Sequence, residues 1–110
     1  MQVTTRKSGT ATLVDVVGDI DLYNSPDIRK VLMDALRGKK APRVVVNLKA
    51  VRYIDSSGVA SLVEALKVSR ELGSRLQLTG LSPAAREVLE LSRLISVFEV
   101  YDSEEQALAS

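Results

Sequence analysis

Cysteine and histidine are both absent from this chain of 110 residues. Without cysteine, the chain forms no disulfide and offers no thiolate for catalysis. Without histidine, it lacks the commonest metal ligand and the commonest general base. It also contains no Ser-Lys catalytic motif and no glycine-rich phosphate loop of the Gly-x-x-x-x-Gly-Lys type. We therefore expect a protein that is not an enzyme and needs neither a metal nor a cofactor.

Long apolar runs and a strong net charge are missing as well. The longest uninterrupted apolar runs are three residues, as in Val44-Val45-Val46, which is too short for a transmembrane helix or a signal-peptide core. The net charge of +1 gives no electrostatic reason to expect binding to nucleic acid or to an anionic membrane. We expect a cytoplasmic protein with no direct membrane contact.

The remaining composition is that of an ordinary globular protein, with 45% apolar and 26% charged residues. A chain of this length is expected to form one domain, here residues 1–110, without linkers or repeats. We expect the free protein to be a monomer.

Strand-like and helix-like segments alternate along the chain. The strands are expected at residues 2–7, 11–18, 43–48, 76–78 and 98–101, and the helices are expected to begin at Ser25, after Asp55-Ser56-Ser57-Gly58, at Ser82-Pro83 and near Ser103. Ser25 is the predicted cap of the first helix, which Gly38 ends, and Gly73 ends the second.

This alternation predicts an α/β fold with a mixed, mostly parallel sheet of about five strands and about four helices. The first two strands can pair as a hairpin at one edge. Parallel sheets carry their sites in the loops at the carboxyl ends of the strands. Two loops of this kind are candidates, at residues 18–25 and 49–58.

Three residues of the helix-capping type stand in a row at Asp55-Ser56-Ser57, followed by Gly58. One interpretation is capping alone, which one of the three would satisfy. If Ser57 is the cap, Ser56 lies one step outside the helix with a free hydroxyl. A hydroxyl there suits phosphorylation, because the helix dipole and the free amides stabilise the added charge.

The other loop, Gly18 to Pro26, contains Asp19 and Asp21. Its plain interpretation is a solvated loop with capping residues. Two aspartates without a histidine or an ordered third carboxylate do not make a metal site.

Four segments together resemble a known family. They are Gly18-Asp19-Ile20-Asp21-Leu22-Tyr23-Asn24-Ser25-Pro26, Val46-Asn47-Leu48, Tyr53-Ile54-Asp55-Ser56-Ser57-Gly58, and Ser82-Pro83 with Val88-Leu89. In order and spacing they resemble the STAS domain of bacterial anti-sigma factor antagonists. The resemblance spans nearly the whole chain and implies a sheet with its helices packed on one side.

The resemblance also implies a function in partner switching. An unphosphorylated antagonist binds an anti-sigma factor that is also a serine kinase, and this releases the sigma factor. The kinase inactivates the antagonist by phosphorylating the serine after the motif aspartate, here Ser56, and a phosphatase reverses the reaction. ATP belongs to the kinase. The partner-binding residues implied are Asp19, Asp21, Tyr23, Asp55, Ser56, Ser57, Gly58 and Val59.

The sequence departs from the family pattern at one point, because the usual Gly-Leu-Gly is Gly58-Val59-Ala60 here. Some STAS proteins with a similar helix are accessory subunits on the ATPase of a lipid-transporting ABC system, and this is the alternative function.

A residue without a Cβ allows near contact, so we expect Gly58 to support the close approach of a partner.

Overall fold

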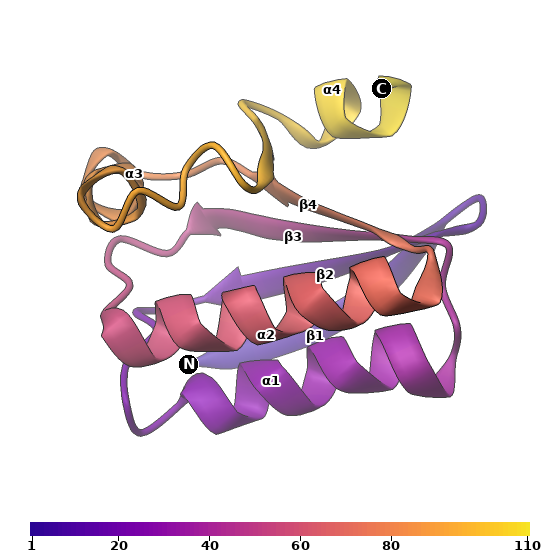
Figure 1. Cartoon of the computed structure of the whole chain (residues 1–110), viewed down its shortest axis with the longest axis horizontal. Helices are drawn as coiled ribbons and strands as arrows, with labels where there is room; N and C mark the ends of the chain where they lie inside the picture. The colour runs from indigo at the N-terminus through magenta and orange to yellow at the C-terminus, as the bar shows by residue number, and fades with distance from the viewer.

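The computed structural model describes residues 1–110 and contains one five-stranded sheet (Figure 1). The strands lie in chain order, β1 (Gln2–Ser8), β2 (Ala11–Val17), β3 (Arg43–Ala50), β4 (Arg75–Thr79) and β5 (Glu99–Tyr101). β1 pairs with β2 in antiparallel orientation, and every other pair is parallel. The mixed, mostly parallel sheet predicted from the sequence is therefore confirmed.

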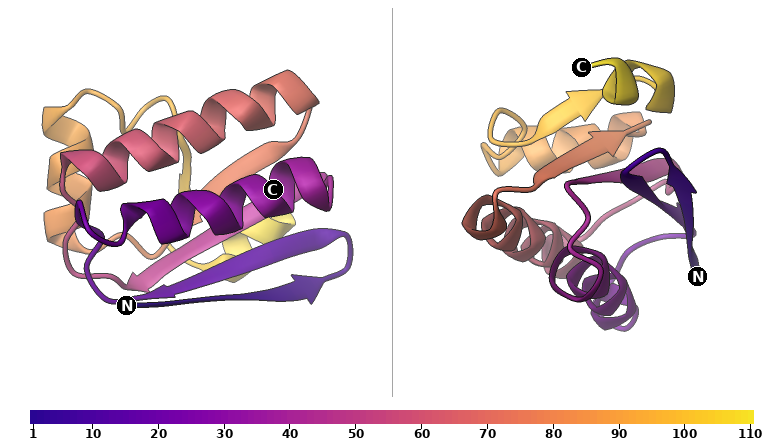
Figure 2. Two further views of the ribbon diagram at one scale, coloured as in Figure 1. Left: turned by 90° about the horizontal axis from the view of Figure 1, so that it is seen from below. Right: turned by 90° about the vertical axis from the view of Figure 1, so that its right-hand side faces the viewer.

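Four α-helices connect or follow the strands, as predicted. They are α1 (Ser25–Met33), continued by a π-helical turn η1 (Asp34–Gly38), α2 (Ser56–Leu72), α3 (Pro83–Leu91) and α4 (Glu104–Ala109). α1 and α2 lie side by side on one face of the sheet (Figure 2). Helices of this crossover type follow from parallel strands, whose ends cannot be joined by a tight turn.

The main core lies between the sheet and these helices. It is a cluster of 23 buried residues, to which β3 contributes Val44, Val46 and Leu48. Leu32 and Leu62 pack against it from α1 and α2, and both are fully buried. Leu89 of α3 belongs to the same cluster. The helical spacing of apolar residues read from the sequence thus corresponds to the buried faces of all three helices.

The expectation that all helices pack on one side needs a correction for α4. Successive side chains of a strand point to opposite faces, so Leu13 and Val45 project away from the main core. Both are fully buried, because Ala107 of α4 covers them in a separate cluster. Arg43 donates to the main-chain oxygens of Ala107 and Leu108 and so holds the end of α4 against this outer face.

The start of α3 and the end of α2 follow the predicted chemistry, whereas the start of α1 does not. Ser82 accepts a hydrogen bond from the amide of Ala85 at 3.1 Å, and Gly73 ends α2 with a φ of 71°. Ser25, the predicted cap of α1, is instead its first helical residue, and Asn24 takes the capping position. The Asn24 side chain makes no capping bond to α1; its Oδ1 accepts a hydrogen bond from the amide of Asp21, in the preceding loop, at 2.8 Å.

An ion network joins β1, β2 and α4 on the outer face of the sheet. Arg6 binds Asp15 through Nε and Nη2, at 2.6 and 2.9 Å, and it also pairs with Glu104. Asn47 donates to Asp15 at 2.9 Å. The hydrogen bonds from Arg6, with that from Asn47, hold the pKa of Asp15 below its ordinary value against the opposing effect of burial.

This network predicts a pH-dependent contribution to stability. The depressed pKa of Asp15 means that its contribution is present above the ordinary aspartate pKa of about 4 and is lost as the pH falls through the folded-state value. Asp15→Asn should therefore unfold more easily than wild type at neutral pH, by about 1 kcal/mol for a partly exposed pair. The difference should shrink in acid.

Urea denaturation at neutral and acidic pH measures this difference. Asp102→Asn is the matched control, because Asp102 is exposed and forms no ion pair, and it should change stability little at either pH. A deficit of Asp15→Asn that stays constant down to the most acidic pH would contradict this role of the charge.

Candidate functional site

The two loops singled out from the sequence are joined by their backbones. Ile20 and Ile54 form an isolated parallel bridge. The amide of Ile20 donates to the carbonyl of Tyr53, and the amide of Asp55 donates to the carbonyl of Ile20, both at 3.0 Å. Both isoleucine side chains are fully buried and fix the bridge to the core. The loop before α1 and the loop before α2 therefore form one surface at the carboxyl end of the sheet.

Asp55 is the residue that links this surface to α2. Its Oδ1 accepts the amide of Gly58 at 3.0 Å, which caps the helix, and its Oδ2 accepts the amide of Leu22 at 3.1 Å. The hypothesis that Ser57 is the cap is therefore corrected. Aspartate and serine cap equally well, and the spacing from Asp55 to Gly58 suits the cap bond to the third helical amide.

Ser56 and Ser57 are the first two residues of α2, so Ser56 does not lie outside the helix as its sequence context suggested. Ser56 is exposed and Ser57 is half-buried. The first amides of a helix lack intrahelical partners and carry a partial positive charge. The Ser56 hydroxyl thus lies at an anion-favouring helix end and is exposed, although it is inside the first turn and not one step before it.

Gly58 and Val59 are buried in the free chain. A Cβ on Gly58 would lie 2.6 Å from Cγ2 of Ile54 and 2.7 Å from Cγ2 of Ile20. The missing side chain therefore makes room for the bridge between the two loops. This internal packing supplies a reason for glycine at residue 58 that is different from the predicted approach of a partner.

The loop before α1 presents two exposed apolar side chains. Leu22 is 65% exposed and Tyr23 is 90% exposed. Oδ1 of Asp21 accepts the amides of Tyr23 and Asn24 at 2.9 and 3.1 Å, and the Asn24 side chain donates to the carbonyl of Asp19 at 2.8 Å. These bonds fold the loop into a compact turn that holds Leu22 and Tyr23 outward.

Removing the Asp55 carboxylate should loosen both loops. Asp55→Ala loses the cap of α2 and the bond to Leu22, so we expect a loss of about 1 to 2 kcal/mol in unfolding free energy. Asp19→Ala is the control, because the Asp19 side chain accepts no hydrogen bond. Amide hydrogen exchange at Leu22 and Gly58 checks the mechanism, and unchanged protection of Leu22 in Asp55→Ala would contradict it.

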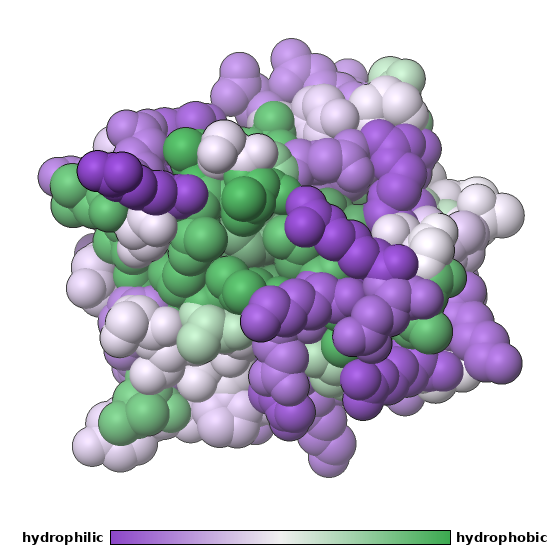
Figure 3. All heavy atoms as spheres, in the orientation of Figure 1, coloured by the Kyte–Doolittle hydropathy of each residue, from purple (hydrophilic) through white to green (hydrophobic).

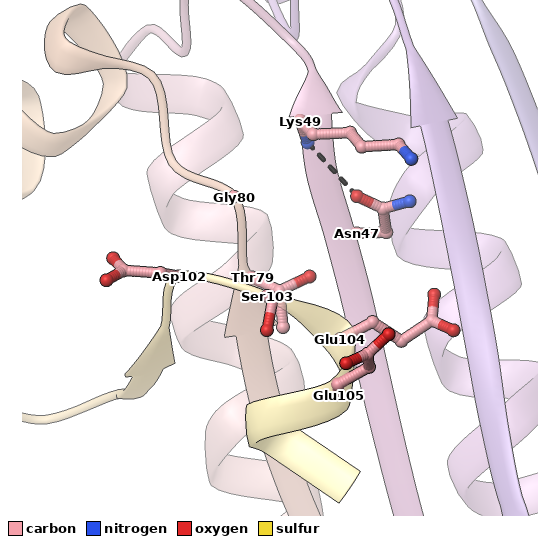
Figure 4. Close-up of a pocket in the computed structure, with 8 residues that line it drawn as sticks. All are labelled: Asn47, Lys49, Thr79, Gly80, Asp102, Ser103, Glu104 and Glu105. Carbon is pink, nitrogen blue, oxygen red and sulfur yellow. Dashed lines mark hydrogen bonds between the residues drawn. The ribbon is translucent and has the colours of Figure 1, made fainter.

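A polar hollow of about 290 Å³ lies on the other face of the sheet, beside α4 (Figure 4). None of the residues that line it is hydrophobic; they are Asn47, Lys49, Thr79, Gly80, Asp102, Ser103, Glu104 and Glu105. The sequence analysis did not predict a hollow at this place. No group of three or more carboxylates is arranged to hold a metal ion. None of the helices combines the length and the apolar character that a membrane span requires.

Comparison with known proteins gives a consistent result. The family model of the STAS domain matches residues 2–107. The anti-sigma F factor antagonist of Paenibacillus polymyxa is 25% identical over 96 residues, which cover 87% of this chain and 82% of the relative. The anti-sigma-B factor antagonist of Listeria monocytogenes is 32% identical over 89 residues, covering 81% and 77%.

Two solved structures show the same fold. An anti-sigma factor antagonist from Mycobacterium paratuberculosis superposes with a TM-score of 0.86 at 24% identity, covering 98% of this chain and 91% of that one. The phosphorylated form of the Bacillus cell fate determinant SpoIIAA superposes with a TM-score of 0.75 at 20% identity, covering 98% and 97%. The chain belongs to the STAS domain family and is of the anti-sigma factor antagonist type.

Proposed function

We propose that this chain is an anti-sigma factor antagonist whose binding is controlled at Ser56. With Ser56 unmodified, it binds an anti-sigma factor that is also a serine kinase, and the sigma factor is released. The observation that carries the proposal is the exposed Ser56 hydroxyl on the first residue of α2, directly after the capping Asp55. The names of the relatives support the class of partner.

The surroundings of Ser56 suit a residue that is modified without unfolding the domain. A phosphate at a helix N-terminus meets the positive end of the dipole and nearby amides. Asp55 precedes it, and the bond from Leu22 to Asp55 brings the Asp21 turn next to it. In the free protein, water screens the repulsion between phosphate and carboxylates, whereas in a complex it does not.

The partners proposed are the kinase and a phosphatase that acts on phosphorylated Ser56. The residues proposed to contact the kinase lie on and around the two joined loops, residues 18–25 and 49–58. The chain itself supplies neither ATP nor a catalytic base to this reaction, and we propose that it acts as a monomer without nucleic acid or a cofactor. A sigma factor and its regulators work in the cytoplasm, so this is the proposed compartment.

The alternative of an ABC-transporter subunit has less support. The relatives are named as anti-sigma factor antagonists. The departure that suggested the alternative, Ala60, lies on an exposed position of α2, where a methyl group disturbs no internal contact.

Phosphosite mapping tests the proposal. The purified chain is incubated with ATP and the anti-sigma factor kinase of its own organism, and the products are analysed by mass spectrometry. A single phosphate on Ser56, and release of the sigma factor by the unmodified chain alone, are expected. A chain that forms no complex with the kinase and remains unphosphorylated would refute the proposed function.

A further inference from the structure

Three residues of α2, beginning with Ser56, are aligned on one face of the helix along nearly its whole length. Ser56, Val63 and Arg70 follow one another at intervals of seven residues, which is nearly two helical turns, so their side chains lie in one line. Seven residues rise about 10 Å, so Arg70 lies about 20 Å along the helix from Ser56. Ser56 and Arg70 are exposed and Val63 is partly exposed. A partner that reaches Ser56 from this side meets the rest of the line.

An apolar area borders this line. In Figure 3 a continuous apolar area, hollowed at its centre, lies where Figure 1 shows α2, α3 and the connection from α3 to β5. The partly exposed apolar residues of these elements include Val63 of α2 and, on the connection, Leu94 and Ile95, which pack against the main core, and Val97. Val97 is 39% exposed, and Leu91 at the end of α3 is 77% exposed. We call this area the α2–α3 apolar surface.

Arg70 marks the far end of the α2–α3 apolar surface. Its Nη2 donates to the carbonyl of Val97 at 3.2 Å, so the guanidinium reaches from α2 to the connection. Neither Arg70 nor its neighbour Lys67 forms an ion pair, and both are exposed. The bond to a carbonyl leaves the positive charge of Arg70 uncompensated and available to a carboxylate.

The charges change sign along the line. Asp21 and Asp55 lie at the Ser56 end of α2, Val63 lies midway along the helix, and Lys67 and Arg70 lie towards its other end, where Arg70 meets Val97. A complementary surface carries a basic group, then apolar side chains, then an acidic group. Complementarity of this kind fixes the orientation of a partner and steers its approach.

We propose that the kinase acting on Ser56 also binds the α2–α3 apolar surface through such a strip, with its basic group facing Asp21 and its acidic group facing Arg70. The inference rests on the proposed function and adds a second contact region, about 20 Å from the modified hydroxyl. This region determines specificity, because it selects for a kinase with the matching strip and is remote from the chemistry at Ser56.

Two variants test this region against matched controls. Arg70→Glu reverses the charge, and Val97→Asp places a charge in the apolar surface. Lys30→Glu reverses an exposed charge on α1, and Leu72→Asp changes a half-exposed residue on the far side of α2. Circular dichroism and thermal melting confirm that each variant is folded, and Arg70→Gln serves as a milder second variant. The probe is the purified anti-sigma factor kinase of the same organism.

We expect Arg70→Glu and Val97→Asp to raise the Kd for the kinase about tenfold or more, and the controls to change it less than about threefold. In phosphorylation assays, Arg70→Glu should raise the KM for the chain and leave kcat unchanged, because the remote contact supplies binding energy only.

The outcomes separate this inference from the proposed function. If Ser56→Asp weakens binding and both test variants bind like wild type, the remote contact is refuted and the switch at Ser56 stands. If wild type neither binds the kinase nor is phosphorylated, both are refuted. If the chain is a dimer that Val97→Asp converts to a monomer, with unchanged kinase affinity, the apolar surface binds a second copy and the inference is again wrong.

Discussion

Replacing Gly58 by leucine should destabilise the fold by about 3 kcal/mol or more, a large part of the stability of a small domain. The reason is steric. The Cβ position alone is 2.6 and 2.7 Å from methyl groups of Ile54 and Ile20, which are themselves fully buried. Because neither isoleucine can move without disturbing the core, the added atoms would push the two loops apart.

Gly58→Ala gives a graded version of the same test. In a helix, alanine is more favourable than glycine by about 1 kcal/mol. At a helical position free of contacts, replacing glycine by alanine would therefore stabilise the protein. Here we expect the steric effect to win and Gly58→Ala to be destabilised. Ala60→Leu is the control, since Ala60 is exposed two residues further along α2, and it should change stability by less than about 0.5 kcal/mol.

Urea denaturation of the three variants measures these differences in unfolding free energy. A Gly58→Leu variant with wild-type stability would contradict the internal role of Gly58 and restore the original interpretation of a partner contact. Because the substitution is expected to unfold the site, loss of kinase binding by Gly58→Leu alone would not identify a contact surface. Exposed residues such as Tyr23 are the better probes of contact.

The arrangement of strands and helices could be predicted because its signals are local. The run Val44-Val45-Val46 fits a buried strand, and Gly38 and Gly73 fit helix ends. The position of α4 could not be predicted in this way. α4 covers the face of the sheet to which Leu13 and Val45 point. The strand register determines which face that is, and the alternation of strands and helices along the sequence does not specify the register.

The two candidate loops were predicted at the carboxyl ends of strands, and the structure joins them there, but the contacts within and between them were not predicted. Ser25 and Ser57 were expected as caps from their residue type, and Asn24 and Asp55 take those positions. Residue type ranks these four similarly as caps, so the choice is made by distant contacts. The bond from Leu22 to Asp55 joins residues 33 positions apart, and no local pattern signals it.

The state of Ser56 should decide whether the kinase is bound. Ser56→Ala should bind the kinase permanently and carry no phosphate, because a methyl group packs at an interface without the cost of burying a charge. Ser56→Asp should fold normally, since a carboxylate suits a helix N-terminus, and should bind more weakly. Ser57→Ala is the matched control for folding; with Asp55 as the cap, it should change stability by no more than about 0.5 kcal/mol.

The phosphorylated protein should show the largest loss of affinity for the kinase. Phosphate adds about −1.5 to −2 charges at neutral pH next to Asp55 and the Asp21 turn. In the complex these charges lose water and repel one another, so binding should weaken by about 2 to 5 kcal/mol, or roughly thirtyfold to several thousandfold in Kd. Titration of each form by calorimetry, with melting curves recorded in parallel, measures binding and stability separately. Phosphate found on Ser57 would show that the two serines are assigned the wrong way round, and equal affinities of Ser56→Ala and Ser56→Asp, with neither serine phosphorylated, would refute the switch.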